Sequence, residues 1–534
     1  MSTLDAVRLA HQASFGPSEL LVEQIRTAGV AGWVAAQMST SGSRYARGGG
    51  DAIHKHTAST DFCDNPANGG NNCWRDWYSA QPLVWDFYRN AMTQPDQLRQ
   101  RVAFALQQIL VVSDNAVFGT YGLRNYHNAL LDNAFGNYRQ VLRKVTLSPV
   151  MGDYLNNANN DKDAPNENFA RELLQLFSIG TCELNADGSV RGGTCLQTYS
   201  NDTVRNYAFA LTGWTYPPGG ATPWGCWPRG ANCQYYGGDM VPVAALHDNW
   251  ARTLLSGVSV PATRTPAQAL DLVLDSVMNH PNTAPFISRQ LIQHLVSSNP
   301  SGPYVQRVSS AFASGRFTAS AALGGRSFGS GQRGDLAATV AAILLDPEAR
   351  GDAAPRHAGM LRPPVLAFTG VLRALNGRTD GQALGWWWGD TMRQLVFTPP
   401  SVFNFYPPDF PVAGTSLVGP AFGIHNANTA LERLNFLTYL LDWGGSQPEA
   451  NVPDALGTQV SLTAFVADAA DAARLVDRLS TLAYGAPLPA AARTQVINAV
   501  SWWTSTTDRN NWQTNRVKTA AWLVFAAPQF QVIR

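Results

Sequence analysis

Helical spacing of apolar residues is the feature that most constrains the fold of this chain. In residues 94–113 apolar side chains recur every three or four positions, as they do on one face of an amphipathic helix. Strand-like alternation is confined to short pieces near 190–199 and 234–243. The sequence therefore predicts a mainly α fold with minor β structure. We expect further helices at 17–28, 76–92, 123–145, 201–213, 266–280, 281–297, 303–314, 335–346, 357–375, 427–442, 460–482, 488–503 and 512–526.

Long irregular segments separate the predicted helices. Structureless loops of more than about 12–15 residues are uncommon in compact domains and often carry function. Nothing in the sequence resembles a low-complexity linker, so we expect one large helical domain with long ordered loops. Its Ala-rich end is expected to form a subdomain, which divides the chain into 1–446 and 447–534. The irregular segments are 40–74, 156–166, 181–199, 214–263, 315–334 and 376–426.

The charge balance excludes several classes of ligand. There are 39 Lys and Arg residues and 38 Asp and Glu residues among 534, and charged residues make up 14% of the chain, against roughly 25% in an ordinary globular protein. A net charge of +1 argues against nucleic acid or anionic lipid as the main ligand. The sequence also has no apolar run of the roughly 18 residues needed to span a membrane.

The cysteines form three close sequential pairs, and each pair brackets a loop-like segment. Six cysteines allow 15 connectivities, but we expect sequential pairing because each bond would close a short loop. Unpaired thiols are the alternative, and a zinc site is less favoured because C-x2-C spacing is absent. Three disulfides indicate an oxidising compartment. The predicted pairs are Cys63 with Cys73, Cys182 with Cys195, and Cys226 with Cys233.

The N-terminus shows neither the basic segment nor the apolar segment of a signal peptide, since Met1 leads directly into STLDAVRLAHQASFG. Together with the cysteines, this predicts a periplasmic or secreted protein from which a signal peptide has been removed. A cytoplasmic protein is the alternative.

Acidic and amide side chains gather in NNANNDKDAPNENFARE, residues 156–172. We expect a helix from Glu167 onward, with Glu167 and Arg171 paired one turn apart. Glu172 has fewer obvious partners, and Asp161 and Asp163 lie in the loop upstream.

Three interpretations of this acidic segment are open. It can be a helix start decorated with acids that favour the helix dipole. It can be a catalytic carboxylate group, with Glu172 or Glu167 as general acid and Asp161 or Asp163 as base, as in glycoside hydrolysis. It can also hold calcium, whose hard oxygen ligands are present, although the glycine of an EF-hand loop is absent. No other cofactor is expected.

Tryptophans concentrate in or beside the long loops. Three consecutive tryptophans, residues 386–388, cannot all face one core, so we expect Trp386 and Trp387 to line a cleft. Trp214, with Arg171, is a further candidate for ligand binding. His247 next to Asp248 is either structural or a general acid or base held by a carboxylate. Flat aromatic faces with polar neighbours suit sugar rings.

Two short motifs are discounted. GRSFG (325–329) fits G-x-S-x-G around Ser327, but its flanks read as loop, whereas a nucleophile elbow joins a strand to a helix. GSGQRG (329–334) fits G-x-G-x-x-G, but no strand precedes it and no parallel sheet is predicted. An oxidoreductase therefore has no cofactor motif to support it.

Several segments resemble a large bacterial family catalogued as domain of unknown function 1800. The resemblance implies an exported protein that often accompanies another exported protein. The family's pattern of His-Asp followed by Lys is matched here by His247 and Asp248, with Arg252 in place of the lysine. The similar segments include LRQRVAFALQQILVVSD (98–114), LLDNAFGNYRQVLRKVTLSPVMGDYL (130–155), NENFARELLQLFSIG (166–180), YSNDTVRNYAFALTGW (199–214), GDLAATVAAILLDPEAR (334–350) and PPSVFNFYPPDFP (399–411).

These features together predict an exported glycan-active enzyme. The expected reaction is hydrolysis of a polysaccharide or oligosaccharide by paired carboxylates beside a tryptophan-lined cleft. The alternative is a non-catalytic exported protein that binds glycans or assembles the cell envelope with an exported partner.

Overall fold

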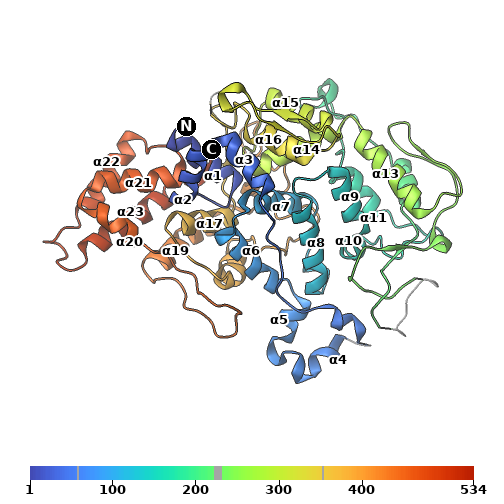
Figure 1. Ribbon diagram of the computed structural model, residues 1–534, viewed down its shortest axis with the longest axis horizontal. Helices are drawn as coiled ribbons and strands as arrows, with labels where there is room; N and C mark the ends of the chain where they lie inside the picture. Colours follow the sequence, from blue (N-terminus) through green and yellow to red (C-terminus); the bar gives the residue numbers. More distant parts are fainter. Residues whose placement is uncertain (57–58, 222–230, 352–353) are drawn as a thin grey trace.

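The computed structural model describes residues 1–56, 59–221, 231–351 and 354–534 of the chain. It confirms the mainly α prediction, because 52% of it is helical and the described residues form 23 α-helices, while the described sheets are four pairs of two-residue strands. Figure 1 shows the helices packed into one elongated body. One hydrophobic core runs through it, from Ala6 near the N-terminus to Ile533 near the C-terminus.

Helix α7 (Gln97–Ile109) lies at the centre of this body and is buried on almost every side. A helix enclosed all round has no solvated face, so even its polar residues Gln100, Arg101 and Gln108 are buried. Its packing partners are α1 (Thr3–Ala13), α3 (Val30–Ser39), α6 (Gln81–Thr93), α8 (Thr120–Asp132) and α14 (Thr283–Leu295).

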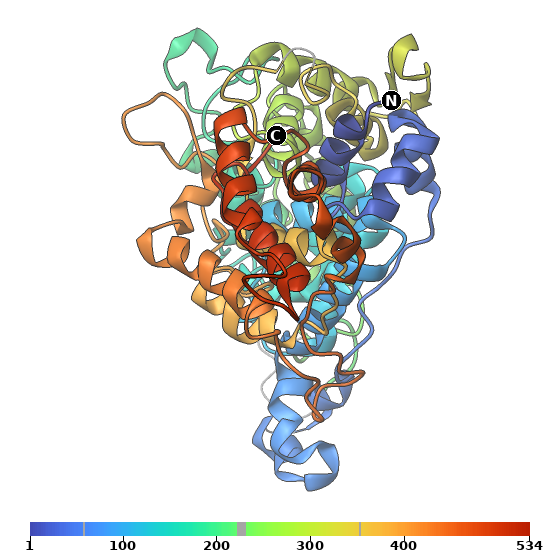
Figure 2. The same cartoon turned by 90° about the vertical axis from the view of Figure 1, so that its left-hand side faces the viewer.

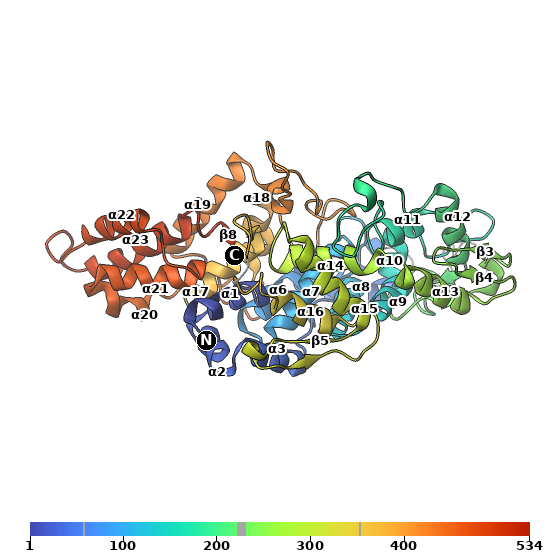
Figure 3. The same cartoon turned by 90° about the horizontal axis from the view of Figure 1, so that it is seen from above.

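The C-terminal helices form one end of the molecule (Figure 3). The last strand pair joins β7 (Met360–Leu361) to β8 (Val532–Ile533), so the chain's end returns to the middle of the sequence. Helix α21 packs on α1 and on α17, and α19 packs on α23. The boundary predicted at residue 447 stays a prediction. The helices here are α17 (Pro364–Ala374), α18 (Gly389–Thr391), α19 (Ala427–Leu441), α20 (Thr463–Val466), α21 (Ala472–Tyr484), α22 (Ala490–Ser501) and α23 (Trp512–Ala526).

The opposite end holds the helices and strand pairs of residues 138–279 (Figures 1 and 3). The strand pairs are β1 (Trp214–Thr215) with β2 (Val241–Pro242), and β3 (Arg252–Thr253) with β4 (Ser259–Val260). The alternation near 190–199 yields isolated bridges instead of a strand. The helices are α9 (Tyr138–Leu147), α10 (Pro149–Tyr154), α11 (Asn168–Gln175), α12 (Asn201–Ala210) and α13 (Pro266–Asn279).

The remaining elements complete the body and one projection. Helices α2 (Glu19–Ala28), α15 (Gly302–Ser314) and α16 (Leu336–Leu344) pack with those already described, as does the pair of β5 (Phe317–Thr318) and β6 (Ser327–Phe328). Helices α4 (Ser59–Asp64) and α5 (Cys73–Tyr78) project from it, as Figures 1 and 2 show.

Two of the predicted helices are divided in the structure by a capping side chain. The helix predicted at 123–145 is α8 and α9, because the Asn137 side chain accepts a hydrogen bond from the Arg139 N–H and starts a new helix. The helix predicted at 460–482 is α20, a short 3-10 turn and α21, because Asp471 caps α21 by accepting from the Arg474 N–H. In both cases a capping side chain interrupts an otherwise continuous apolar pattern.

Two of the three predicted disulfides are present. Cys63 is bonded to Cys73 and Cys182 to Cys195, with Cα–Cα distances of 5.6 and 4.9 Å. Cys226, which was expected to pair with Cys233, lies outside the described residues. None of the described helices is both long enough and apolar enough to cross a membrane.

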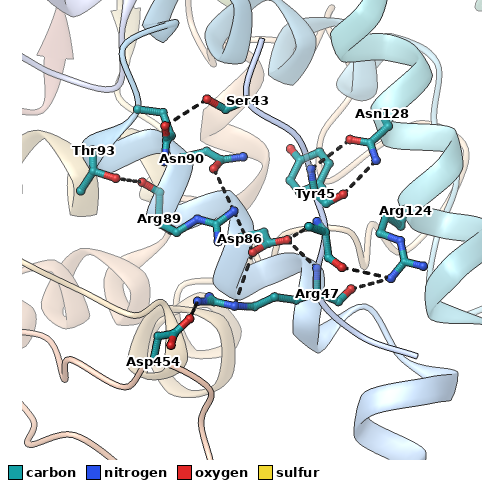
Figure 4. Close-up of polar contacts among 12 residues, drawn as sticks. Ser43, Tyr45, Arg47, Asp86, Arg89, Asn90, Thr93, Arg124, Asn128 and Asp454 are labelled. Atoms are coloured by element: carbon teal, nitrogen blue, oxygen red, sulfur yellow. Dashed lines mark hydrogen bonds and ion pairs between the residues drawn. The ribbon is translucent and has the colours of Figure 1, made fainter. Parts of the chain in front are cut away.

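A buried carboxylate holds the extended segment after α3 in place (Figure 4). Asp86 of α6 is fully buried, and its Oδ2 accepts hydrogen bonds from the backbone N–H groups of Ala46 and Arg47. Its other oxygen lies 3.1 Å from Arg89 Nη2 and 3.6 Å from Arg47 Nε. Asn128 of α8 pairs with both backbone groups of Tyr45. The segment is therefore ordered by side chains of helices instead of by regular structure of its own.

Candidate ligand-binding sites

The acids predicted in residues 156–172 are held mainly by local contacts. Glu167 Oε2 lies 3.0 Å from Arg171 Nη2, and both side chains are partly exposed, so Arg171 is engaged in this expected ion pair. Asp161 Oδ1 accepts a hydrogen bond from the backbone N–H of Asp163 at 3.1 Å, which closes a turn. The Asp163 side chain itself is exposed. Three of the four predicted catalytic carboxylates thus lie in or beside ordinary turn and helix-start contacts.

Glu172 differs from these three acids. Its Oε2 is buried and has no hydrogen-bond partner among the described residues. Burial raises the pKa of this carboxyl, and the neighbouring Arg171 opposes the shift. Its negative charge in turn contributes to the raised pKa values of Tyr154 and Tyr199. Glu172 is therefore a partly buried acid whose neutral form is favoured by burial, and tyrosine hydroxyls lie in its surroundings.

The loop before α11 packs against the segment that holds Trp214. The backbone N–H of Asn159 donates to the Trp214 carbonyl at 2.8 Å, and that of Gly213 donates to Asn160 at 3.0 Å. Gly213 has φ +85°, and a Cβ there would lie 2.6 Å from the Cβ of His247. Only glycine allows this close approach. The fold thus brings the acidic loop, Trp214 and His247 together.

His247 and Asp248 do not form the expected pair. His247 is buried, and its Nδ1 lies 2.7 Å from the Thr212 carbonyl, which requires Nδ1 to carry the proton. Asp248 is bound through both oxygens by Arg252, at 2.7 and 3.0 Å. No described hydrogen bond joins the His247 ring to the Asp248 carboxylate, and a role for either residue in ligand binding stays a prediction. Burial also lowers the pKa of His247, so its ring is neutral near pH 7.

A ligand at the protein surface cannot reach the Trp214 side chain. It is buried, and its indole N–H is without a hydrogen-bond partner within the described chain. Its ring belongs to the central hydrophobic core. Trp214 therefore fills the interior instead of lining an open cleft.

The three consecutive tryptophans divide between core and surface. They lie in a π-helical turn, Leu384–Trp388. Trp388 is buried, and Trp387 stacks on it with a 4.9 Å centroid distance. Trp386 is 73% exposed. Trp386 is thus accessible to a ligand, Trp387 is partly accessible, and Trp388 packs in the interior.

Trp386 lines a pocket of 610 Å³ beside the projecting helices. Trp74 and Phe118 also line it, and their side chains are 51% and 59% exposed. Tyr78 supplies a fourth ring. The volume falls within the roughly 300–1,000 Å³ of ordinary ligand pockets. Amide side chains surround the rings, from Asn71, Asn72, Gln81, Gln382 and Asn451.

One carboxyl group faces this aromatic pocket, and sequence reasoning missed it. Asp114 lines the pocket and accepts a hydrogen bond from the backbone N–H of Ala80. Its Oδ1 is buried and has no hydrogen-bond partner in the described part of the chain. Burial raises the pKa of Asp114 to about 6. Its position after a long helical segment gave no indication of a binding role, because a single acid that follows a helix is common.

The predicted acids and the predicted tryptophans therefore do not meet in one pocket. None of the residues 156–172 lines the aromatic pocket, where Asp114 is the carboxyl present. Arg75, the cation in its wall, is paired with Asp76 at 2.7 Å and lies 5.0 Å from the Trp85 ring centroid. Within the described ranges, no group of three or more His, Cys, Asp or Glu side chains is placed to hold a metal ion.

Comparison with known proteins identifies the family of this chain but assigns it no activity. A family model described as "Protein of unknown function (DUF1800)" matches residues 8–532, nearly the whole chain. No curated protein and no solved structure matches the chain.

Proposed function

The chain belongs to the DUF1800 family of proteins of unknown function, and from its pockets we propose that it is an exported glycan-binding protein. The proposed ligand is a neutral polysaccharide or oligosaccharide bound in the aromatic pocket of Trp74 and Trp386. Export is supported by the disulfides Cys63–Cys73 and Cys182–Cys195, since such bonds persist in oxidising compartments.

One observation carries this proposal: exposed aromatic faces and amide groups share one pocket. The C–H faces of a sugar ring are apolar and pack on indole rings, whereas its hydroxyl groups need donors and acceptors at the rim. Amides supply both kinds of group. The cation of the wall is already neutralised by Asp76, so the pocket does not select an anion.

Hydrolysis of the glycan is the second candidate, and Asp114 is the observation that favours it. A carboxyl with a pKa of about 6 can donate a proton to a leaving oxygen near neutral pH. Glycoside hydrolysis usually needs two carboxyl groups about the scissile bond, and Asp114 is the single acid in the pocket lining. Binding is therefore better supported than catalysis. The hydrolase hypothesis built on Glu172 stays a prediction.

Substitution of the two indoles tests the proposal. We expect Trp74→Ala and Trp386→Ala each to weaken binding of a soluble polysaccharide by roughly thirtyfold, because each loses about 2 kcal/mol of aromatic burial. Trp443→Ala is the matched control, since Trp443 is 67% exposed and lies outside the pocket. Isothermal titration calorimetry over a panel of neutral polysaccharides measures the affinities.

The same panel of polysaccharides, assayed for released reducing ends, distinguishes binding from hydrolysis. A binding protein releases no reducing ends, whereas a hydrolase releases them and loses that activity in Asp114→Asn. If no glycan binds, or if the Trp443 variant is affected as strongly as the pocket variants, the proposed site is wrong.

A further inference from the structure

In the middle of the molecule lies a buried arginine that has no ion-pair partner among the described residues. Arg101 lies on α7 and has no solvent exposure. Its Nη2 donates to the backbone carbonyl of His294, but Nε and Nη1 have no hydrogen-bond partner in residues 1–56, 59–221, 231–351 and 354–534. Burial lowers its pKa to about 10, and Tyr406 opposes this shift. At neutral pH Arg101 is still a cation.

The Arg101 side chain lines a cavity of 70 Å³. Gln290 and Asn404 line the same cavity, and their side-chain N–H₂ groups also have no hydrogen-bond partner within the described residues. Asn404 is held in a left-handed backbone conformation, with φ +67°. The cavity is well above the roughly 10–15 Å³ that one water molecule requires.

Each of these unpartnered groups is a hydrogen-bond donor. A buried amide N–H without an acceptor costs about 1–3 kcal/mol, and an unpaired buried charge costs several. Water can accept hydrogen bonds from these donors, but it cannot neutralise the guanidinium. An anion does both, and the fork of an arginine side chain matches the two oxygens of a carboxylate.

We propose that this cavity binds a small organic anion through a single carboxylate held by Arg101, Gln290 and Asn404. The lining offers one positive charge, because His294 lies beside Arg101 and burial together with that cation lowers its pKa to about 3. A monovalent anion balances that charge, whereas a divalent phosphate leaves a buried excess of negative charge. The site is separate from the aromatic pocket and does not depend on glycan binding.

The rest of the cavity indicates why the anion should be organic. Phe104, Ile109 and Leu366 also line the cavity and give it apolar walls. A short hydrocarbon portion would fit against these side chains while the carboxylate meets Arg101. Phe403 also lines the cavity and is 46% exposed, so one wall lies at the protein surface.

Thermal denaturation in the presence of small anions tests the proposal. The intact protein is dialysed into a zwitterionic buffer, and its Tm is followed with sodium acetate, propionate or butyrate at constant ionic strength. We expect the carboxylates to raise Tm in a saturable manner, since a ligand that binds only the folded state stabilises it. Inorganic phosphate and chloride serve as comparison anions and should give no saturable shift.

Two variants and one control locate the effect. Arg101→Met should abolish the carboxylate-dependent shift without lowering Tm in the absence of anion, because it removes an unpaired buried charge. Gln290→Met should weaken carboxylate binding about tenfold, the loss of one hydrogen bond to a charged group, and it reports on the site even if Arg101→Met does not fold. Arg373→Met is the matched control, because buried Arg373 donates to the carbonyls of Gly16 and Ala91; it should lower Tm and keep the shift.

Three results would overturn the proposal: no carboxylate shift in the unaltered protein, a shift confined to phosphate or chloride, or a shift that both Gln290→Met and Arg101→Met retain in full.

Discussion

At the residue scale, chemistry in this protein depends on which polar side chains the fold leaves without partners. The sequence draws attention to Glu167 and Asp163 because they stand in a conspicuous acidic run, yet the first is ion-paired and the second is exposed. Asp114 stands alone in the sequence and is the carboxyl in the aromatic pocket. Burial distinguishes these acids, and burial is a property of their surroundings.

The pKa of Asp114 predicts a specific pH dependence of stability. The folded protein holds this proton up to pH about 6, whereas the unfolded chain loses it near the ordinary value of 3.8. A raised folded pKa in an acid means that stability is lost as pH rises from 3.8 to 6. Asp114→Asn removes the ionisation, so it should be more stable than the unaltered protein at pH 8, by about 2–3 kcal/mol, and equally stable below pH 4.

Urea denaturation from pH 4 to pH 8 measures this difference. Asp163→Asn, an exposed acid in the same chain, is the control and should give no comparable gain. A difference between Asp114→Asn and the unaltered protein that does not vary with pH would contradict the assignment.

At the element scale, side chains on helices hold the long loops. Asp86 on α6 binds the backbone of Ala46 and Arg47 (Figure 4), and Asp153 on α10 accepts hydrogen bonds from Tyr216, Gln234 and Tyr236 of a later loop. These carboxylates order loop segments that have almost no regular structure of their own. The same kind of local bond, at Asn137 and Asp471, divides two helices that apolar spacing alone predicts as continuous.

Asp86 and Asp454 both pair with Arg47, so their substitutions can be compared directly. Asp86→Ala should lower the free energy of unfolding by about 3–5 kcal/mol, because it leaves backbone donors and arginine side chains without their buried acceptor. Asp454→Ala should cost less than about 1 kcal/mol, since Asp454 pairs with the same Arg47 but is largely exposed. Chemical denaturation measures both, and equal losses would contradict the role given to burial.

At the scale of the whole molecule, segments from the two ends of the chain complete one core. Arg362 is fully buried, donates to the Phe530 carbonyl at 2.7 Å and lies 4.2 Å from the centroid of its ring. Strand β8, which follows Phe530, pairs with β7, which precedes Arg362. Helix α21, from the C-terminal part, packs directly on α1. The last residues are therefore structural although they stand at a terminus.

Truncation tests this role of the C-terminus. Removal of residues 530–534 should lower the free energy of unfolding by at least about 3 kcal/mol, because Arg362 loses its acceptor and the core loses buried apolar surface. Removal of the exposed Arg534 alone should have almost no effect. Calorimetry measures both, and an unchanged Tm after the longer truncation would contradict the structural role of Phe530.

The sequence by itself determined the helical class and most helix positions, and it favoured the two disulfides that are described. Each of these depends on residues close together in the chain: apolar spacing, a capping side chain or a short cysteine loop. It also singled out Trp386 and Trp387, because three adjacent indoles cannot share one face.

Only the tertiary structure decided which polar groups share a pocket. Arg101 and Asn404, or Asp114 and Trp386, are distant in sequence and meet because helices pack around α7. Whether a charge is exposed, paired or left buried without a partner depends on these distant contacts, and it is this environment that gives a side chain its affinity and its pKa.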